Sequence, residues 1–131
     1  MDAPTVKPTA TAVAPDWVRR IFEAVDAGDA RRFAAVFTED GQFVFGNAPA
    51  VLGKPAVEQA VAGFFASIRG CRHELRRFWS GAGHCAMDGT VTYLRHDGRE
   101  LTVPFANVFV MRGEQVAEYR VYVDAAPLFA P

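Results

Sequence analysis

The sequence predicts an α+β fold, in which a curved, mainly antiparallel sheet wraps round N-terminal helices to form a cone with an interior pocket. Two observations lead to this fold class. Residues 102–111 and 115–124 are runs of strand-forming residues separated by a short Arg-Gly-Glu break, which is typical of a long hairpin. Before them, residues 16–37 carry apolar side chains at helical spacing, interrupted at Gly28.

Length and composition favour one globular domain. The chain has 131 residues, and we expect the domain to span residues 16–131, with a disordered or loosely docked tail at residues 1–15. Half of the residues are hydrophobic and the formal net charge is -1, which is typical of a soluble globular protein. No basic cluster is large enough for nucleic acid, and no apolar run reaches the roughly 20 residues of a membrane span.

Three helices are expected in the first half of the chain. Asp16 is predicted to cap a helix that carries Ile21 and Phe22 on its apolar side and stops near Gly28. Asp29 can cap a second, shorter helix, and a Gly-Lys-Pro sequence that starts at Gly53 begins the third.

The strands are expected mainly in the second half. A turn at residues 40–41 leads into a short strand, 42–45, and four longer strands follow at about 71–79, 84–96, 99–111 and 115–124. Asp97-Gly98 predicts a two-residue hairpin turn that sets Thr92 opposite Val103. Pro104 cannot donate to a sheet ladder, so we expect a bulge or an edge there that bends the strand.

The two cysteines, Cys71 and Cys85, are predicted to be free thiols. The expected hairpin keeps them too far apart for a disulfide, which needs Cα atoms within about 7 Å. Free thiols favour a cytoplasmic location.

Strand alternation and the expected register place a polar set on the inner face of the sheet. Its members are His73, Asp88, Thr90, Thr92, Asn107 and Tyr119. Apolar side chains are expected to surround it, namely Trp17, Phe43, Phe45, Phe105, Phe109 and Val121. Asn107 falls beside Tyr119, and an amide inside apolar walls needs a partner, which Tyr119, water or a ligand can supply.

Two residues of this set are candidates for catalysis. His73 is either a general acid or base or a core histidine with a satisfied hydrogen bond, and Asp88 is either a pocket acid or an exposed residue near a turn. Asp124, at the end of the last strand, is expected at the rim. The spacing of the three histidines and two cysteines predicts no metal site, and no nucleophile elbow or nucleotide-binding motif is present, so we expect no cofactor.

Four motifs resemble the nuclear transport factor 2-like superfamily, within it the SnoaL-like branch. They are Val-Asp-Ala-Gly-Asp at 25–29, Phe-Thr-Glu-Asp-Gly at 37–41, Gly-Lys-Pro-Ala-Val at 53–57 and Tyr-Arg-Val-Tyr-Val-Asp at 119–124. The resemblance covers residues 16–129 and implies the cone fold, which hosts many activities.

The resemblance extends to limonene epoxide hydrolase and ketosteroid isomerase, but the chain departs from both. The hydrolase's Tyr and Asn correspond to Phe43 and Phe45, and its Asp-Arg-Asp relay to Thr92, Thr90 and Val121. The isomerase's Tyr, Asp base and protonated Asp correspond to Ile21, Phe45 and Asn107. Cyclases of the SnoaL-like branch use a pocket acid, for which His73 and Asp88 are the candidates here.

Two functions follow as alternatives. The first is an isomerase, cyclase or hydrolase that acts by proton transfer on a small, apolar carbonyl compound, with Asn107 and Tyr119 polarising the carbonyl. The second is a non-catalytic module that binds a hydrophobic ligand or dimerises. In both we expect a homodimer through the outer sheet face, with Val91, Tyr93, Val108 and Tyr122 pointing outward.

Overall fold

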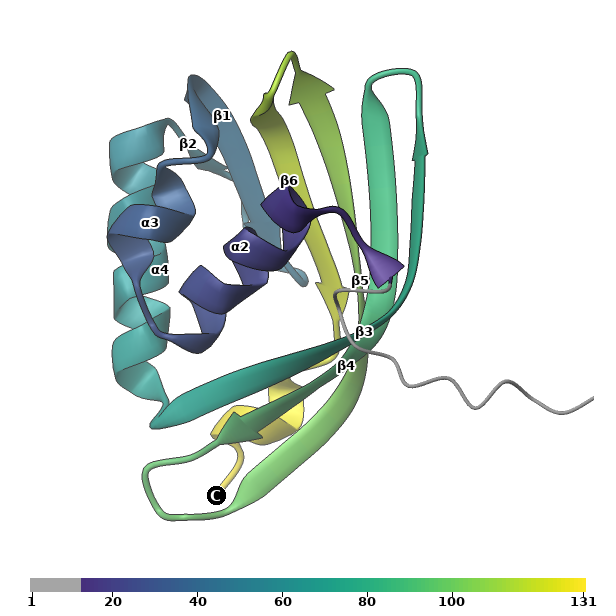
Figure 1. The fold of residues 1–131 in the computed structure, drawn as a ribbon. Helices are drawn as coiled ribbons and strands as arrows, with labels where there is room; N and C mark the ends of the chain where they lie inside the picture. Colours follow the sequence, from purple (N-terminus) through teal and green to yellow (C-terminus); the bar gives the residue numbers. More distant parts are fainter. Residues whose placement is uncertain (1–12) are drawn as a thin grey trace, which may run out of the picture.

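A computed structural model describes residues 13–131 as helices packed on one side of a bent sheet (Figure 1). The helices are α2 (Asp16–Asp26), α3 (Ala30–Ala34) and α4 (Lys54–Ser67), with a short 3-10 helix, η1 (Ala126–Phe129), near the end of the chain. The strands are β1 (Phe37–Phe45), β2 (Val51–Leu52), β3 (Gly70–Gly81), β4 (His84–Leu94), β5 (Glu100–Arg112) and β6 (Gln115–Val123). The predicted α+β class is confirmed.

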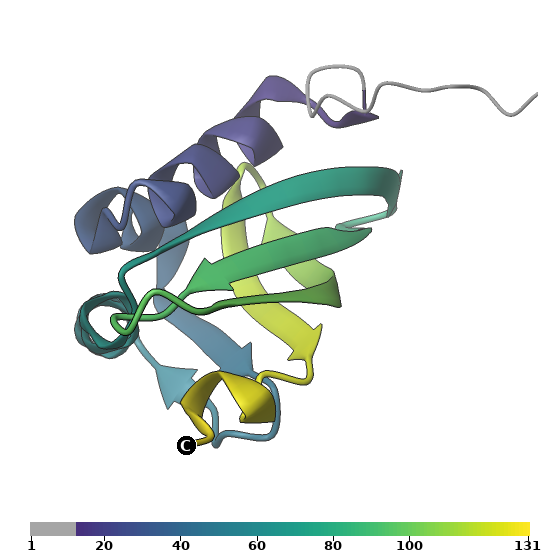
Figure 2. The same cartoon turned by 90° about the horizontal axis from the view of Figure 1, so that it is seen from below.

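The sheet has six strands in the order β2-β1-β6-β5-β4-β3. Only β1 and β6 run parallel, and every other pair is antiparallel. The sheet bends round the helices, and Figure 2 shows α2 and α4 on its concave side. The first strand is longer than expected because residues 37–41 join it instead of turning, and β2 was not predicted.

The connection between α2 and α3 positions an acidic side chain. Gly28 adopts φ 68°, and the amides of Gly28 and Asp29 donate to the carbonyls of Val25 and Ala24. Asp29 then caps α3 by accepting from the amide of Arg32, as predicted. Asp16 does not cap α2, because the helix already includes it and Pro15 occupies the cap position. The carboxyl end of α2 thus stops at Asp26, beside β3.

The hairpin loops set which strand residues face inward. Residues 95–99 connect β4 to β5, and the amide of Arg95 donates to the carbonyl of Arg99, which closes a three-residue loop in which Gly98 adopts φ 88°. Thr92 therefore pairs with Thr102 and not with Val103. A one-residue slip of this kind moves a whole strand's side chains to the opposite face.

Pro104 lies in the part of β5 that pairs with β4 but not with β6. It pairs with Thr90 of β4, whereas the pairing of β5 with β6 begins only at Phe105. Its missing N–H therefore costs no ladder bond. The edge predicted at Pro104 is confirmed on the β6 side, and no register shift occurs there.

An aromatic cluster holds β1, β6 and α3 together. Tyr119 stacks on Phe37 at 5.7 Å between ring centroids and packs against Phe109 at 4.3 Å and Phe33 at 5.1 Å. Phe37 and Phe109 have no exposed surface. This cluster fixes the middle of β6, where Tyr119 lines an apolar cavity.

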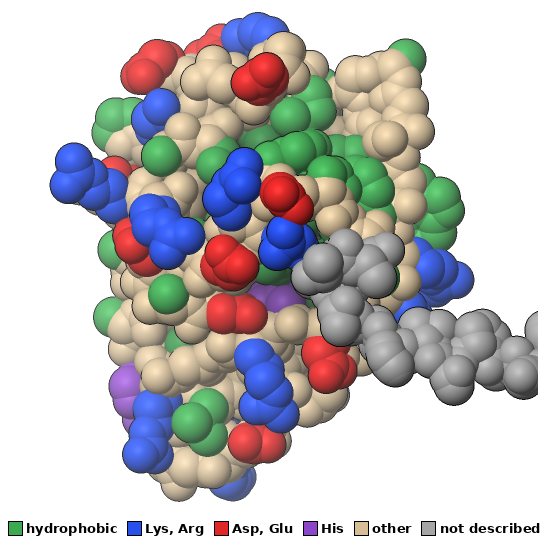
Figure 3. Space-filling view, in the orientation of Figure 1, with side chains coloured by type: hydrophobic (Ala, Val, Ile, Leu, Met, Phe, Trp, Pro, Cys, Tyr) green, Lys and Arg blue, Asp and Glu red, His purple; other side chains and the backbone are tan. Residues whose placement is uncertain are grey.

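The start of the described chain packs on the domain, and the surface over the helices is charged. Residues 1–12 of the expected tail lie outside the described residues, while Ala14 is buried against the core. On the face seen in Figure 3, basic and acidic side chains are intermingled over the helices. Within residues 13–131, no helix has the length and apolar character needed to cross a membrane.

Candidate functional site

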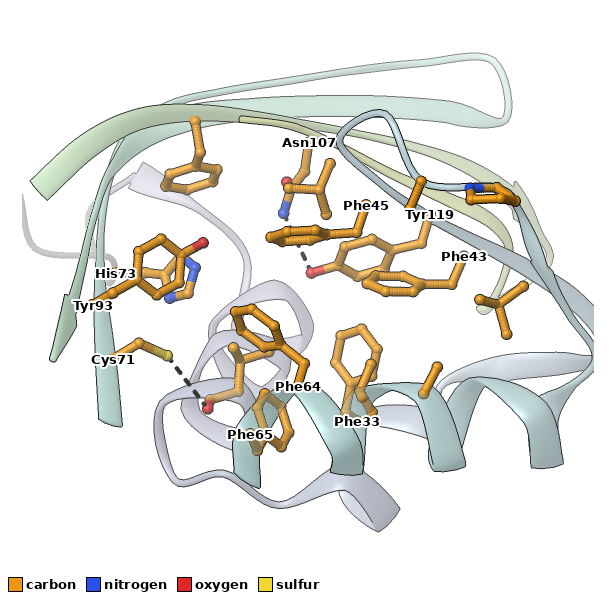
Figure 4. Close-up of a pocket in the computed structure, with 18 residues that line it drawn as sticks. Phe33, Phe43, Phe45, Phe64, Phe65, Cys71, His73, Tyr93, Asn107 and Tyr119 are labelled. Atoms are coloured by element: carbon orange, nitrogen blue, oxygen red, sulfur yellow. Dashed lines mark hydrogen bonds between the residues drawn. The ribbon is translucent and has the colours of Figure 1, made fainter. Parts of the chain in front are cut away.

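An apolar cavity of about 180 Å³ lies between the concave face of the sheet and helix α4 (Figure 4). Its wall is mostly aromatic and aliphatic, and both the sheet and the helices contribute side chains to it. The lining residues are Val25, Phe33, Phe43, Phe45, Ala48, Pro49, Val51, Ala60, Val61, Phe64, Phe65, Cys71, His73, Tyr93, Phe105, Asn107, Tyr119 and Val121. A mostly apolar cavity with a few polar groups is typical of a small-molecule site.

The main titratable group in the wall is His73, which is paired with Asp26. Nδ1 of His73 lies 2.7 Å from Oδ1 of Asp26, and the backbone amide of His73 donates to Oδ2 at 3.0 Å. The imidazole ring also packs against the rings of Phe22 and Phe105, at 5.0 and 5.1 Å between centroids. A neutral imidazole that donates from Nδ1 to a carboxylate keeps Nε2 as an acceptor, so this ring can take a proton.

Cys71 completes a three-residue cluster with Asp26 and His73. Its thiol donates to the carbonyl of Val25 at 3.8 Å and to Oδ1 of Asp26 at 3.9 Å. Burial, with the negative charge of Asp26, raises the pKa of Cys71 to about 12, so the group stays a thiol at neutral pH. It is therefore a poor nucleophile.

The same cluster offers a set of possible metal ligands that the sequence spacing did not predict. One nitrogen, one sulfur and one oxygen atom of Asp26, Cys71 and His73 lie within 4.8 Å of one another. Zinc accepts such ligands, but they must be deprotonated and free. Here the carboxylate already bonds both His73 and Cys71, so metal binding requires that these hydrogen bonds open.

A second polar pair, Asn107 and Tyr119, lies deeper in the wall. Nδ2 of Asn107 donates to the Tyr119 hydroxyl at 3.3 Å, and both residues are 2% exposed. The contact was predicted, although Asn107 pairs across the ladder with Val121 and Tyr119 with Phe109. Burial raises the pKa of Tyr119, which keeps its hydroxyl neutral. Oδ1 of Asn107 is buried without a partner among the described residues.

Tyr93 brings a further hydroxyl into the cavity. It is 3% exposed, and an edge contact with Phe64 at 5.9 Å holds its ring. Figure 4 shows its oxygen directed into the space that His73 and Asn107 border. The expectation that Tyr93 and Val91 point outward is wrong, because the three-residue loop turns both inward, where they are buried.

The sequence-predicted site residues divide into two groups. Those that line the cavity are His73, Phe43, Phe45, Phe105, Asn107, Tyr119 and Val121. Those that do not line it are Asp88, Thr90, Thr92, Trp17 and Phe109. The register slip explains the first three of these, since the structure places Met87, Gly89 and Val91 of β4 inward instead.

Each misplaced residue has another role. Asp88 forms an ion pair with Arg77 at 2.7 Å on the outer face, and Thr92 hydrogen-bonds Thr102 there. Phe109 is buried beneath Tyr119, and Trp17 packs against it while lining a separate groove. The prediction that Asp88 faces the interior is therefore wrong, which leaves His73 as the sequence-predicted catalytic candidate within the cavity.

Sequence reasoning missed Asp26, Cys71 and Tyr93. Asp26 lies 47 residues from His73, and no local pattern connects an acid at a helix end to a particular strand residue. Cys71 shares the inward face of β3 with His73, two residues away, so strand alternation alone could have found it. Predicting that Tyr93 faces the cavity would have required the correct length of the loop between β4 and β5.

A curved sheet closed by helices round an apolar cavity defines the nuclear transport factor 2-like class of α+β proteins. Within it, the model of the SnoaL-like domain matches residues 18–119, and the chain belongs to that family. No curated protein sequence matches the chain.

Solved structures support the fold at low sequence identity. A hypothetical protein with a ketosteroid isomerase-like fold from Catenulispora acidiphila, in complex with trimethylamine, is 17% identical with a TM-score of 0.78, covering 84% of this chain and 86% of that one. TerC, co-crystallised with polyporic acid, is 16% identical with a TM-score of 0.74, covering 85% and 91%. A candidate SnoaL-like polyketide cyclase from Jannaschia species CCS1 is 16% identical with a TM-score of 0.71, covering 85% and 87%.

Proposed function

We propose that this protein is an enzyme that moves a proton next to the carbonyl group of a small, largely apolar compound. The observation that carries the proposal is the His73–Asp26 pair, because it places an oriented imidazole in the wall of an apolar cavity. Membership of the SnoaL-like family supports a small-molecule site, and the structurally similar candidate polyketide cyclase supports this kind of chemistry.

The reaction uses groups of the cavity wall, together with the Asp26 carboxylate that bonds His73. Nε2 of His73 takes a proton from the carbon next to the carbonyl, and the electron pair of that C–H bond moves toward the carbonyl oxygen to form an enolate. The Asp26 carboxylate stabilises the imidazolium that results. Returning the proton to a different carbon gives an isomer. Hydrogen-bond donors on Asn107, Tyr119 and Tyr93 are available to stabilise the enolate oxygen.

Exchange of carbon-bound hydrogen tests this function. Ring ketones and enones are incubated in D₂O with wild type, His73→Gln and His84→Gln, and deuterium uptake is followed by NMR. His84 is the matched control because it is exposed and its ring, within residues 13–131, bonds the carbonyl of Ala82 alone. We expect wild type and His84→Gln to exchange equally and His73→Gln to be slower by about 100-fold or more. Equal exchange in all three proteins contradicts the assignment.

The alternative function is binding without turnover. The mostly apolar wall favours it, since a hydrophobic ligand fits there without any proton transfer. Saturable binding of a ring compound by wild type and by His73→Gln, with no exchange in either, supports this alternative.

We also propose a homodimer formed through the outer sheet face, in the cytoplasm. Tyr122 is 55% exposed on this face, and Trp79 is 52% exposed nearby, where Arg77 lies 5.6 Å from its ring. Val108 lies on the same face, between Ala86 and Arg120 in the ladder. The free cysteines support a reducing compartment. Sedimentation of wild type and Val108→Arg tests the dimer, which the charge should dissociate.

A further inference from the structure

Tyr93 places a hydroxyl group in the wall of the cavity. No hydrogen bond to it occurs within residues 13–131, although the residue is 3% exposed. Its ring lines the cavity, with the oxygen directed inward (Figure 4). A hydroxyl that borders an apolar cavity can donate to an acceptor atom of a ligand there, and this hydrogen bond offsets the cost of burying that atom.

Other polar groups of the wall already take part in hydrogen bonds, and Oδ1 of Asn107, which has no partner among the described residues, can only accept. His73 uses Nδ1 and its backbone amide on Asp26, and Asn107 donates to Tyr119. Cys71 donates its thiol proton to the end of α2. Tyr93 is thus free to bind a ligand without breaking a hydrogen bond recorded in the described part of the chain.

The position of Tyr93 relates its hydroxyl to the proposed base. Tyr93 is the ladder partner of Cys71, and Cys71 is two residues from His73 on the inner face of β3. Burial raises the pKa of Tyr93, so the hydroxyl is a neutral donor at physiological pH and does not compete with His73 as a base.

The size of the cavity limits the ligand. About 180 Å³ is slightly more than the roughly 150 Å³ of an engineered cavity that holds benzene. A molecule with one six-membered ring and a short substituent fits this space. Aromatic side chains such as Phe45 and Phe64 can pack against the faces of such a ring.

We propose that Tyr93 donates a hydrogen bond to the carbonyl oxygen of a one-ring ketone or enone and so places the neighbouring carbon against His73. The inference rests on the proposed function for the role of His73, while the hydrogen bond itself concerns binding. As the enolate forms, negative charge gathers on the oxygen that Tyr93 contacts, so the same bond strengthens during proton transfer. Tyr93 both selects the ligand and stabilises the enolate.

Acetophenone and α-methylstyrene form a matched pair of probes, since the second replaces the carbonyl oxygen by a CH₂ group of similar shape. Binding is measured by calorimetry, and the carbonyl stretch of bound acetophenone by infrared difference spectroscopy. The variants are Tyr93→Phe, which removes one oxygen atom, and Tyr122→Phe, which does the same at an exposed position of the outer face.

We expect acetophenone bound to wild type and to Tyr122→Phe to show a carbonyl stretch lowered from its value in hexane. In Tyr93→Phe the stretch should return toward the hexane value. Affinity for acetophenone should fall about fivefold to tenfold, and affinity for α-methylstyrene should stay the same or rise.

The outcomes separate this inference from the proposed function. An unshifted carbonyl in wild type, or the same shift in Tyr93→Phe, overturns the role of Tyr93 and leaves the His73 exchange test untouched. A shift that Tyr93→Phe abolishes, in a protein that shows no hydrogen exchange, supports Tyr93 as the binding residue and contradicts catalysis. If Tyr93→Phe does not fold, Tyr119→Phe, which removes the other tyrosine hydroxyl of the wall, should leave the shift unchanged, and a shift that Tyr119→Phe abolishes overturns the role of Tyr93.

Discussion

Replacing Asp26 by Asn tests the pair on which the proposed chemistry rests. The substitution keeps the shape of the side chain but removes its charge and one of its two acceptor oxygens. The carboxylate of Asp26 now accepts from Nδ1 of His73 at 2.7 Å and from the backbone amide at 3.0 Å. An Asn at this position can satisfy one of the two donors and presents its own NH₂ group to the other.

The expected loss of stability follows from the one hydrogen bond to Asp26 that the Asn side chain cannot replace. A hydrogen bond to a charged group contributes about 1.5–3 kcal/mol, and the side chains of His73 and Asp26 are 11% and 30% exposed, so solvent screens the pair only in part. We take about 2 kcal/mol for the loss of one such bond. Unfolding entropy is about 2.1 cal/mol/K per residue, which for this chain converts the loss to a Tm lowered by about 7 °C.

Urea unfolding and thermal melts followed by circular dichroism measure this change. Asp29→Asn is the matched control in the same connection, because Asn caps a helix as well as Asp does. We expect the control to lie within about 0.5 kcal/mol of wild type. If Asp26→Asn is as stable as the control and exchanges hydrogen at the wild-type rate, the pair neither stabilises the fold nor orients a base.

Two further predictions concern packing and pH. A Cβ added at Gly89 would lie 1.9 Å from the carbonyl oxygen of Glu74, so Gly89→Ala should destabilise by about 3 kcal/mol or more in urea unfolding. Gly63→Ala, on α4 with nothing within 4 Å, should instead stabilise by about 0.5–1 kcal/mol; equal effects would contradict the close approach. The pKa of Cys71 rises from 9.0 to about 12 on folding, so the unfolded state loses its proton first. Stability should therefore fall by up to about 1.4 kcal/mol per pH unit between pH 9 and 12. Cys85, whose pKa is about 11, adds the same trend. The fall in the urea midpoint from pH 8 to pH 10 should be smaller in Cys71→Ala, and an equal fall would show that Cys71 does not cause it.

Local signals in the sequence predicted the helices well. Asp29 and the Gly-Lys-Pro start of α4 act through backbone geometry within one turn, so they need no tertiary information. Asp16 shows the limit of such signals. Pro15 precedes it with extended dihedral angles, which lets the helix begin one residue earlier than a capping role for Asp16 implies.

The face that each strand presents depended on loop lengths. On β3, an extra residue at the bulge between Leu75 and Arg77 offsets the change of register near the hairpin turn, so His73 still faces inward as predicted. On β4, no bulge in the pairing with β5 offsets the one-residue change that the three-residue loop causes. Asp88 therefore moved to the outer face and Tyr93 to the inner one.

The sequence by itself determined the fold class, the family resemblance and the Asn107–Tyr119 contact. It could do so because periodicity, caps and turn residues act over short distances, and because the register of β5 on β6 kept the expected parity. Only the tertiary structure decided that Asp26 meets His73 and that Tyr93 opens into the cavity. The physical reason is that the packing of α2 on β3 and the register of β4 depend on the whole core, so no local sequence pattern predicts them.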